Sequence, residues 1–188
     1  ILNRNINFKK VSSDTWFCKD IKLELIDNIK EDIIIYCCNH GGHGFKLFNE
    51  LVFKKNVMDI CNERYKRLTT PYLGIQIRNT DYICDYKTFF NENEKLINTF
   101  SEIYLATDDI NVLQFFREKG LQIKNFTTFP IQKYRCLHKS DIDPHIKFID
   151  MICDIFILSL SNKLISPSKG GFIRLIKNAR GNNLFKKL

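Results

Sequence analysis

The chain contains an apolar run that ends in charge, Tyr72-Leu73-Gly74-Ile75-Gln76-Ile77-Arg78-Asn79-Thr80-Asp81-Tyr82. Apolar residues alternate with small or polar ones up to Arg78, Pro71 keeps a helix from continuing into the run, and turn-forming residues follow it. The pattern predicts a buried strand. Ligands of open α/β sheets bind outside the carboxyl ends of the strands, so Arg78 is expected in a binding site. The alternative is that Arg78 and Asp81 only form an ion pair across the turn.

Strand-like and helix-like segments alternate along the rest of the chain. Gly120 is expected to end one helix in a left-handed conformation, and the polar segment 130–144 is expected to form a functional loop. This alternation is typical of an α/β protein with a parallel sheet. Apolar runs predict strands at 32–38, 102–107, 121–129 and 163–166, and helical spacing predicts helices at 57–68, 86–100, 110–118, 146–160 and 172–179.

The composition is that of a soluble globular protein with excess positive charge. Of the 188 residues, 44% are hydrophobic, which is enough for a packed core. No apolar run approaches the roughly 18 residues that cross a bilayer. The formal charge of +8 favours an anionic partner, which is a nucleic acid, an acidic membrane or a phosphorylated small molecule. Most aromatic residues lie in apolar periodic segments, and this argues against a nucleic-acid-binding surface.

The cysteine content bears on the cellular compartment. Seven cysteines without the spacing of a disulfide framework predict reduced thiols and favour a cytoplasmic location. One glycosylation sequon, Asn125-Phe126-Thr127, leaves the lumen of the secretory pathway open as the alternative. The sequence begins without Met or a signal peptide, so we expect it to be part of a longer chain. Nothing in the sequence indicates an oligomeric state.

Four residues that could bind zinc cluster near the predicted strand at 32–38: Cys37, Cys38, His40 and His43. Adjacent residues of a strand point to opposite faces, and the spacing matches none of the usual structural zinc patterns. A glycine-rich loop without a metal is therefore the favoured interpretation.

A second glycine-rich stretch, Pro167-Ser168-Lys169-Gly170-Gly171, precedes the last predicted helix. The first backbone N–H groups of a helix and its dipole favour a phosphate group. Ser168 and Lys169 add a hydroxyl and a cation, and Arg78 could bind the same phosphate bidentately. The chain has neither a Walker motif nor G-x-G-x-x-G, so the prediction is a nucleotide site of another type. Three carboxylates could contact a ribose or a base: Asp108, Asp109 and Asp154.

Four segments follow one another in the order of a known set of motifs. They are Gly74-Ile75-Gln76-Ile77-Arg78-Asn79-Thr80-Asp81, Ile103-Tyr104-Leu105-Ala106-Thr107-Asp108-Asp109, Asp154-Ile155-Phe156-Ile157-Leu158-Ser159 and Leu164-Ile165-Ser166-Pro167-Ser168-Lys169-Gly170-Gly171-Phe172-Ile173-Arg174-Leu175. With the lead-in Phe48-Asn49-Glu50-Leu51-Val52-Phe53-Lys54, they resemble the GDP-fucose-dependent fucosyltransferases of the α1,6, NodZ and protein O-fucosyltransferase group. The resemblance spans residues 48–180, which is most of the chain.

The resemblance implies roles for the residues that match the motifs. Arg78 takes the place of the first arginine of a His-x-Arg-Arg-x-Asp motif, the arginine that binds the donor diphosphate. Gln76 replaces the histidine of that motif, and Asn79 replaces its second arginine. Asp154 takes the place of the aspartate that reads guanine.

The remaining matches are less direct. The phosphate-binding serine of the family falls near Gly170, so Ser168 is a shifted substitute. Asp108 and Asp109 are implied to be structural or to bind the nucleotide.

The resemblance also implies a GT-B architecture, in which two Rossmann-like domains face each other. Residues 56–188 would be the C-terminal, nucleotide-sugar-binding domain, a parallel sheet with helices on both faces, and residues 1–55 a remnant of the N-terminal acceptor side with a linker. The implied activity transfers L-fucose from GDP-fucose to a hydroxyl of a glycan or protein, with inversion. It requires no metal or other cofactor. The implied partners are the nucleotide sugar and its acceptor, without nucleic acid or a transmembrane segment.

The implied mechanism depends on charge. Arg78, the amides of Gly170 and Gly171, and Lys169 would stabilise the departing diphosphate. The candidates for a general base are Asp81 and Asp85, which follow the same strand. Two alternatives stay open: a catalytically silent GDP-sugar-binding domain, indicated by the two replaced motif residues, and, remotely, a nucleic-acid-binding module.

Overall fold

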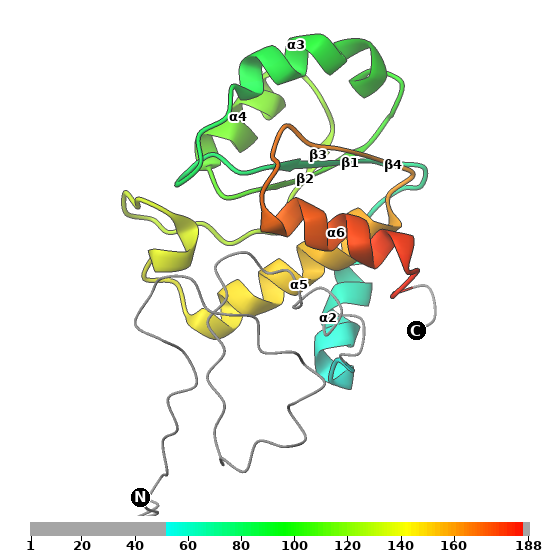
Figure 1. The fold of residues 1–188 in the computed structure, drawn as a ribbon, viewed down its shortest axis with the longest axis vertical. Helices are drawn as coiled ribbons and strands as arrows, with labels where there is room; N and C mark the ends of the chain where they lie inside the picture. Colours follow the sequence, from blue (N-terminus) through cyan, green and yellow to red (C-terminus); the bar gives the residue numbers. More distant parts are fainter. Residues whose placement is uncertain (1–51, 186–188) are drawn as a thin grey trace, which may run out of the picture. The chain divides into compact units, whose positions relative to one another are not determined.

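The computed structural model describes residues 52–185, which belong to one compact unit, Asn49–Leu188. Helices and strands alternate along it (Figure 1). In chain order they are α2 (Lys55–Tyr65), β1 (Leu73–Ile77), α3 (Tyr86–Ile97), β2 (Ile103–Thr107), α4 (Ile110–Glu118), β3 (Ile123–Lys124), the 3₁₀ turn η2 (Leu137–Lys139), α5 (Pro144–Leu160), β4 (Lys163–Ile165) and α6 (Gly171–Gly181).

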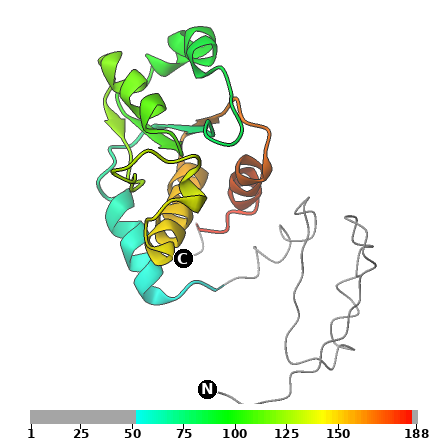
Figure 2. The same cartoon turned by 90° about the vertical axis from the view of Figure 1, so that its left-hand side faces the viewer.

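The four strands form one parallel sheet in the order β3-β2-β1-β4. Helices α3 and α4 cover one face of the sheet, and α5 and α6 cover the other (Figures 1 and 2). The predicted Rossmann-like α/β sheet with helices on both faces is therefore confirmed. From β1 the chain adds β2 and β3 on one side and then returns to place β4 on the other. The direction of winding thus reverses between β1 and β4, which is where ligands of such sheets bind.

Within residues 52–185, the predicted elements agree with the structure in place and type, and one strand is much shorter than expected. The third strand, predicted at 121–129, pairs only over Ile123–Lys124. After Lys124, the side-chain Nδ2 of Asn125 donates to the carbonyl of Leu105 at 2.8 Å. A side chain thus replaces the next backbone bond of the ladder, and the strand ends. Gly120 has φ of +73°, which confirms the left-handed helix end.

Several predictions fall on residues that the structure does not describe. The strand at 32–38 lies outside residues 52–185, as do Cys37, Cys38, His40 and His43. Most of the predicted N-terminal remnant, residues 1–55, does so too. Within residues 52–185, no group of three His, Cys, Asp or Glu side chains could hold a metal ion. Of the helices in that range, none has both the length and the hydropathy needed to cross a membrane.

The core lies on both faces of β1 and β2, whose residues are all buried. On one face the strands pack against aromatic and aliphatic residues of α3 and α4, among them Phe90 and Phe116. On the other face they pack against α5, a largely buried helix. Asp143 caps α5 by accepting from the backbone N–H of His145 at 2.6 Å, and Pro144 occupies the first turn. The helix therefore begins two residues before the predicted start.

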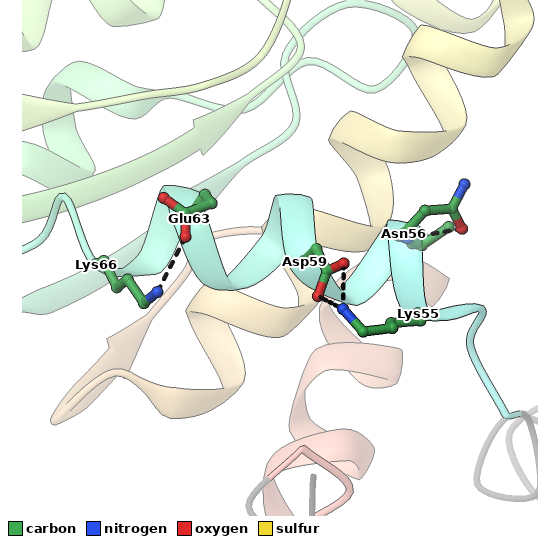
Figure 3. Close-up of polar contacts among 6 residues, drawn as sticks. Lys55, Asn56, Asp59, Glu63 and Lys66 are labelled. Carbon is green, nitrogen blue, oxygen red and sulfur yellow. Dashed lines mark hydrogen bonds and ion pairs between the residues drawn. The ribbon is translucent and has the colours of Figure 1, made fainter.

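Helix α2 contacts α5 through its buried side and carries charge on its outer side (Figure 3). Lys55 pairs with Asp59 at 2.8 Å and Lys66 with Glu63 at 3.0 Å, all with exposed side chains. Such exposed pairs contribute only about 0.3–0.5 kcal/mol each. The buried face of α2 therefore contributes more to holding the helix in place than its charges do.

Gly74 lies where β1 approaches the end of α5 most closely. A Cβ at this position would be 2.7 Å from Ser161 Oγ and 3.0 Å from Leu158 Cδ2. Both distances are shorter than ordinary van der Waals contact, so the strand and the helix could not keep their present separation with a larger residue. Glycine is required here for close packing and not for its backbone conformation.

Gly74→Ala should lower the free energy of unfolding by about 2 kcal/mol because the added methyl group overpacks this contact. Denaturant unfolding monitored by circular dichroism measures the change. Gly181→Ala is the matched control, since a Cβ there meets nothing within 4 Å, and it should shift stability by less than about 0.5 kcal/mol. Equal losses in the two variants would contradict the proposed close contact.

Candidate functional site

A cavity of about 530 Å³ lies at the carboxyl ends of β1 and β2, beside the N-terminal half of α5. The strand ends contribute Gln76, Arg78 and Asp108 to its wall, and α5 contributes Asp150 and Asp154. Its volume is in the range of small-molecule sites. Its position matches the place expected for a ligand from the winding of the sheet.

Arg78 is the first residue after β1, and its side chain is 37% exposed. Its Nε donates to Asp81 Oδ1 at 2.6 Å, and its Nη2 donates to Asp81 Oδ2. The ion pair of the simpler interpretation is therefore present. The guanidinium nevertheless borders the other predicted phosphate element, since a Cβ on Gly170 would lie 3.9 Å from Arg78 Nη1. Arg78 and the start of α6 thus come together.

The loop from β4 to α6 is fastened to the end of β1 by serine hydroxyls. Ser166 Oγ donates to Gln76 Oε1 at 2.8 Å and accepts from the backbone N–H of Ser168 at 3.0 Å. Ser168 Oγ accepts from the backbone N–H of Arg78 at 3.1 Å and is buried. Ser168 therefore acts in positioning the loop, whereas Lys169 beside it is exposed.

Asp108 and Asp109 hold the turn that follows β1. Asp108 accepts from the backbone N–H of Asn79 at 2.7 Å and from the hydroxyl of Thr80 at 2.6 Å. Asp109 accepts from Asn79 Nδ2 at 2.8 Å and caps α4 through the N–H of Asn111 at 2.9 Å. These bonds favour the structural role over contact with a ribose, although Asp108 also lines the cavity.

Asp154 is a buried carboxyl group in the wall of the cavity. Its Oδ1 accepts from the hydroxyl of Tyr104 at 2.5 Å, and its Oδ2 lies 3.5 Å from Thr127 Oγ1. Burial raises the pKa of Asp154 to about 7, and the nearby charge of Asp150 adds to this, whereas the Tyr104 bond opposes it. Oδ2 is therefore only weakly engaged, and the carboxyl group titrates near neutral pH.

The predicted site residues divide into two groups. Gln76, Arg78, Asp108 and Asp154 line the cavity. Those that do not line it are Asp81, Asp85, Asp109, Ser168, Lys169, Gly170 and Gly171, although Phe172 in the first turn of α6 does.

The two candidate bases are both engaged with other groups. The hydrogen bond from Arg78 lowers the pKa of Asp81, and the backbone N–H of Thr88 lowers the pKa of Asp85, which caps α3. A carboxylate with a lowered pKa is a weak proton acceptor at neutral pH, so the geometry favours neither as the base.

Three polar residues in the cavity wall were not among the predicted site residues. Asp150 pairs with Arg64 at 2.7 Å and accepts from the N–H of Thr128 at 2.8 Å. Lys147 donates to the carbonyls of His138 at 3.2 Å and Ser140 at 2.9 Å, which fastens the loop before α5 to the helix. His138 lines the cavity from that loop. The spacing of Lys147, Asp150 and Asp154 on one apolar helix was the feature of the sequence that could have indicated a shared polar face.

Comparisons with known proteins say little about the function of the chain. No protein family matches the sequence, and no curated protein does either. Among solved structures, the chain is similar to NodZ α-1,6-fucosyltransferase soaked with GDP-fucose, with 13% identity and a TM-score of 0.48. The similar region covers 70% of this chain and 44% of that one, so the chain spans less than half of that protein. At this level of similarity, neither a ligand nor an activity follows for this chain.

The raised pKa of Asp154 predicts a pH-dependent cost to stability. Because its folded pKa, about 7, exceeds the ordinary value of 3.8, the folded state binds the proton more tightly, and stability falls as the pH rises from about 4 to about 7. Asp154→Asn removes this dependence and should be more stable than the wild type at pH 8 by an amount on the order of a few kcal/mol. That advantage should shrink toward pH 5.

Denaturant unfolding of both proteins at pH 5, 6, 7 and 8 measures this difference. Asp109→Asn serves as the comparison, since Asp109 is only half-buried. A constant gap between Asp154→Asn and the wild type at every pH would show that the carboxyl group does not titrate in this range.

Proposed function

We propose that the cavity binds the nucleoside diphosphate of a GDP-sugar, and that the chain is the donor-binding part of a GDP-fucose-dependent fucosyltransferase. One observation carries the proposal. Arg78 at the end of β1 and the start of α6 after β4 meet at the edge of a cavity whose wall contains the buried carboxyl group of Asp154. The resemblance of the ordered sequence motifs implies a phosphate-binding arginine, a phosphate-binding loop and a base-reading aspartate at these three points, and this supports the proposal.

The charges where Arg78 meets the start of α6 suit a diphosphate. Arg78 offers Nη1 on the side of Gly170, and α6 begins at Gly171 with its N–H groups and positive dipole end. Lys169 is exposed in the same loop and adds a further cation. Asp81 competes with a phosphate for the guanidinium of Arg78. An incoming diphosphate would therefore share Arg78 with Asp81 or displace it.

The part of the cavity wall at Asp154 suits a base with two donors on one edge. Asp154 Oδ2 is weakly engaged and could accept from a ring N–H and an exocyclic amine of guanine. Uracil lacks the exocyclic amine. Binding of guanine also favours the ionised form of Asp154, so nucleotide affinity should rise with pH around the pKa of about 7.

Transfer would proceed by charge stabilisation without a metal. As the sugar–phosphate bond breaks, negative charge develops on the diphosphate, and Arg78 with the first amides of α6 would stabilise it. The acceptor hydroxyl would attack from the opposite face, which inverts the anomeric centre. The geometry favours neither Asp81 nor Asp85 as the proton acceptor for this step. The acceptor side of the reaction is expected outside residues 56–188.

A catalytically silent GDP-sugar-binding domain is the second candidate. The observation that favours it is the pairing of Arg78 with Asp81, together with glutamine and asparagine where the family motif has histidine and arginine. The remote alternative, a nucleic-acid-binding module, would require many cations along one surface and steep salt dependence.

Calorimetric titration with GDP, GDP-fucose and UDP tests the donor site. We expect GDP and GDP-fucose to bind and UDP to bind far more weakly. Arg78→Ala should weaken GDP binding by roughly 10- to 100-fold, since it removes charge-assisted bonds to phosphate. Arg117→Ala is the matched control, because Arg117 is exposed in the last turn of α4 on the opposite face of the sheet. Equal affinity for GDP and UDP would overturn the guanine assignment.

Release of GDP from GDP-fucose separates the two candidate functions. An active transferase should consume the donor slowly with water, or faster with a suitable glycan, and Arg78→Ala should lower that rate by about 100-fold or more. Phosphorus NMR follows the conversion of donor to GDP. Tight binding of an intact donor, with no release above the uncatalysed rate, would favour the silent domain instead.

A further inference from the structure

Two buried thiols face each other between α2 and α5. Cys61 Sγ and Cys153 Sγ are 3.2 Å apart, and both residues have no exposed surface. A disulfide has an S–S distance of about 2.0 Å, so the two sulfur atoms are little more than 1 Å from bonding distance. Both residues are otherwise free cysteines, as are Cys84 and Cys136.

We propose that Cys61 and Cys153 form a reversible disulfide that ties α2 to α5 when the protein is exposed to a peroxide. The contact joins residues 92 positions apart in the sequence, so the bond would add a covalent link between two elements that non-covalent contacts now hold together. Cys136 is buried but contacts His138, at 3.7 Å, instead of a second thiol.

The surroundings distinguish the two sulfur atoms. The hydrogen bond from the Cys153 thiol lowers the pKa of Cys61, and the guanidinium of Arg64, one turn further along α2, acts in the same direction. The pKa of Cys153 is raised by the same contact and by burial. Cys61 is thus the better thiolate, and Cys153 keeps its proton.

Oxidation of the two thiols by hydrogen peroxide proceeds in two steps. The Cys61 thiolate attacks hydrogen peroxide, which gives a sulfenic acid on Cys61 and releases hydroxide; that hydroxide takes up the proton lost from Cys61 and becomes water. The Cys153 sulfur then attacks the Cys61 sulfur, the S–O bond breaks, and the departing hydroxyl takes the Cys153 proton as a second water. Two thiols are oxidised by two electrons, and one peroxide is reduced to two waters.

The buried position sets the rate of this reaction. Peroxide is small and uncharged, but it must reach sulfur atoms that have no exposed surface. The reaction therefore requires transient opening of the α2–α5 contact. We therefore expect oxidation of the pair to speed up in mild denaturant. The bond would act on the same interface as the ion pair between Arg64 of α2 and Asp150 of α5.

Treating the full chain with hydrogen peroxide and mapping its peptides without reduction tests the proposal. We expect one dominant crosslinked peptide pair containing Cys61 and Cys153, lost on addition of dithiothreitol. The melting temperature should rise by on the order of 5 °C in the oxidised protein and return after reduction. Peptide mapping needs no variant, so a folding defect cannot obscure the result.

Variants supply the controls. Cys153→Ala should leave Cys61 as a sulfenic or sulfinic acid with no crosslink and no rise in melting temperature, whereas Cys84→Ala should form the crosslink as the wild type does. Crosslinks that involve other cysteines, or a Cys61–Cys153 pair still reduced when the remaining thiols are oxidised, would overturn the proposal.

Discussion

The structure depends on the close packing of the central strand β1 against the end of α5. Gly74 allows the strand to approach Ser161, and two hydrogen bonds from Tyr72 hold the contact. Tyr72 donates its hydroxyl to the carbonyl of Ile157 at 2.7 Å and its backbone N–H to Asn162 Oδ1 at 3.0 Å. Because the end of the helix is held to the start of the strand, the N-terminal half of α5 lies beside the carboxyl ends of the strands. The cavity forms between them.

Most of the polar groups around the cavity form hydrogen bonds within the protein, and these bonds fix the shape of the cavity. Hydrogen bonds from Ser166 and Ser168 fasten the β4–α6 loop to β1, and the carboxylates of Asp108 and Asp109 hold the turn after Arg78. A wall supported in this way is already formed before a ligand arrives, so little conformational entropy is lost on binding. Asp154 differs from these groups because burial keeps its proton affinity high.

The sequence predicted the strands and helices well because their patterns are local, as with the alternation before Arg78 and the apolar face of 110–118. It overestimated the third strand because the side chain of Asn125 takes the place of a backbone donor, and no periodicity shows that. It assigned Arg78 to a binding site from its strand-end position and Asp154 to the same site mainly from the family resemblance, and both residues line the cavity. It did not show that Asp108 and Asp109 accept hydrogen bonds from Asn79, or that Ser168 accepts one from Arg78, since those contacts join residues 29, 30 and 90 positions apart.

The side chain of Asn125 also bears on the one glycosylation sequon of the chain. Its Nδ2 donates to the carbonyl of Leu105 at 2.8 Å and to Thr127 Oγ1 at 3.3 Å, which uses both of its hydrogens. An N-linked sugar would be attached to this same nitrogen and would remove one of those hydrogens. Glycosylation and the folded edge of the sheet therefore compete for one atom. In the folded chain, the side-chain amide of Asn125 is hydrogen-bonded to Leu105 of β2. The sequon therefore does not present a free acceptor for a glycan.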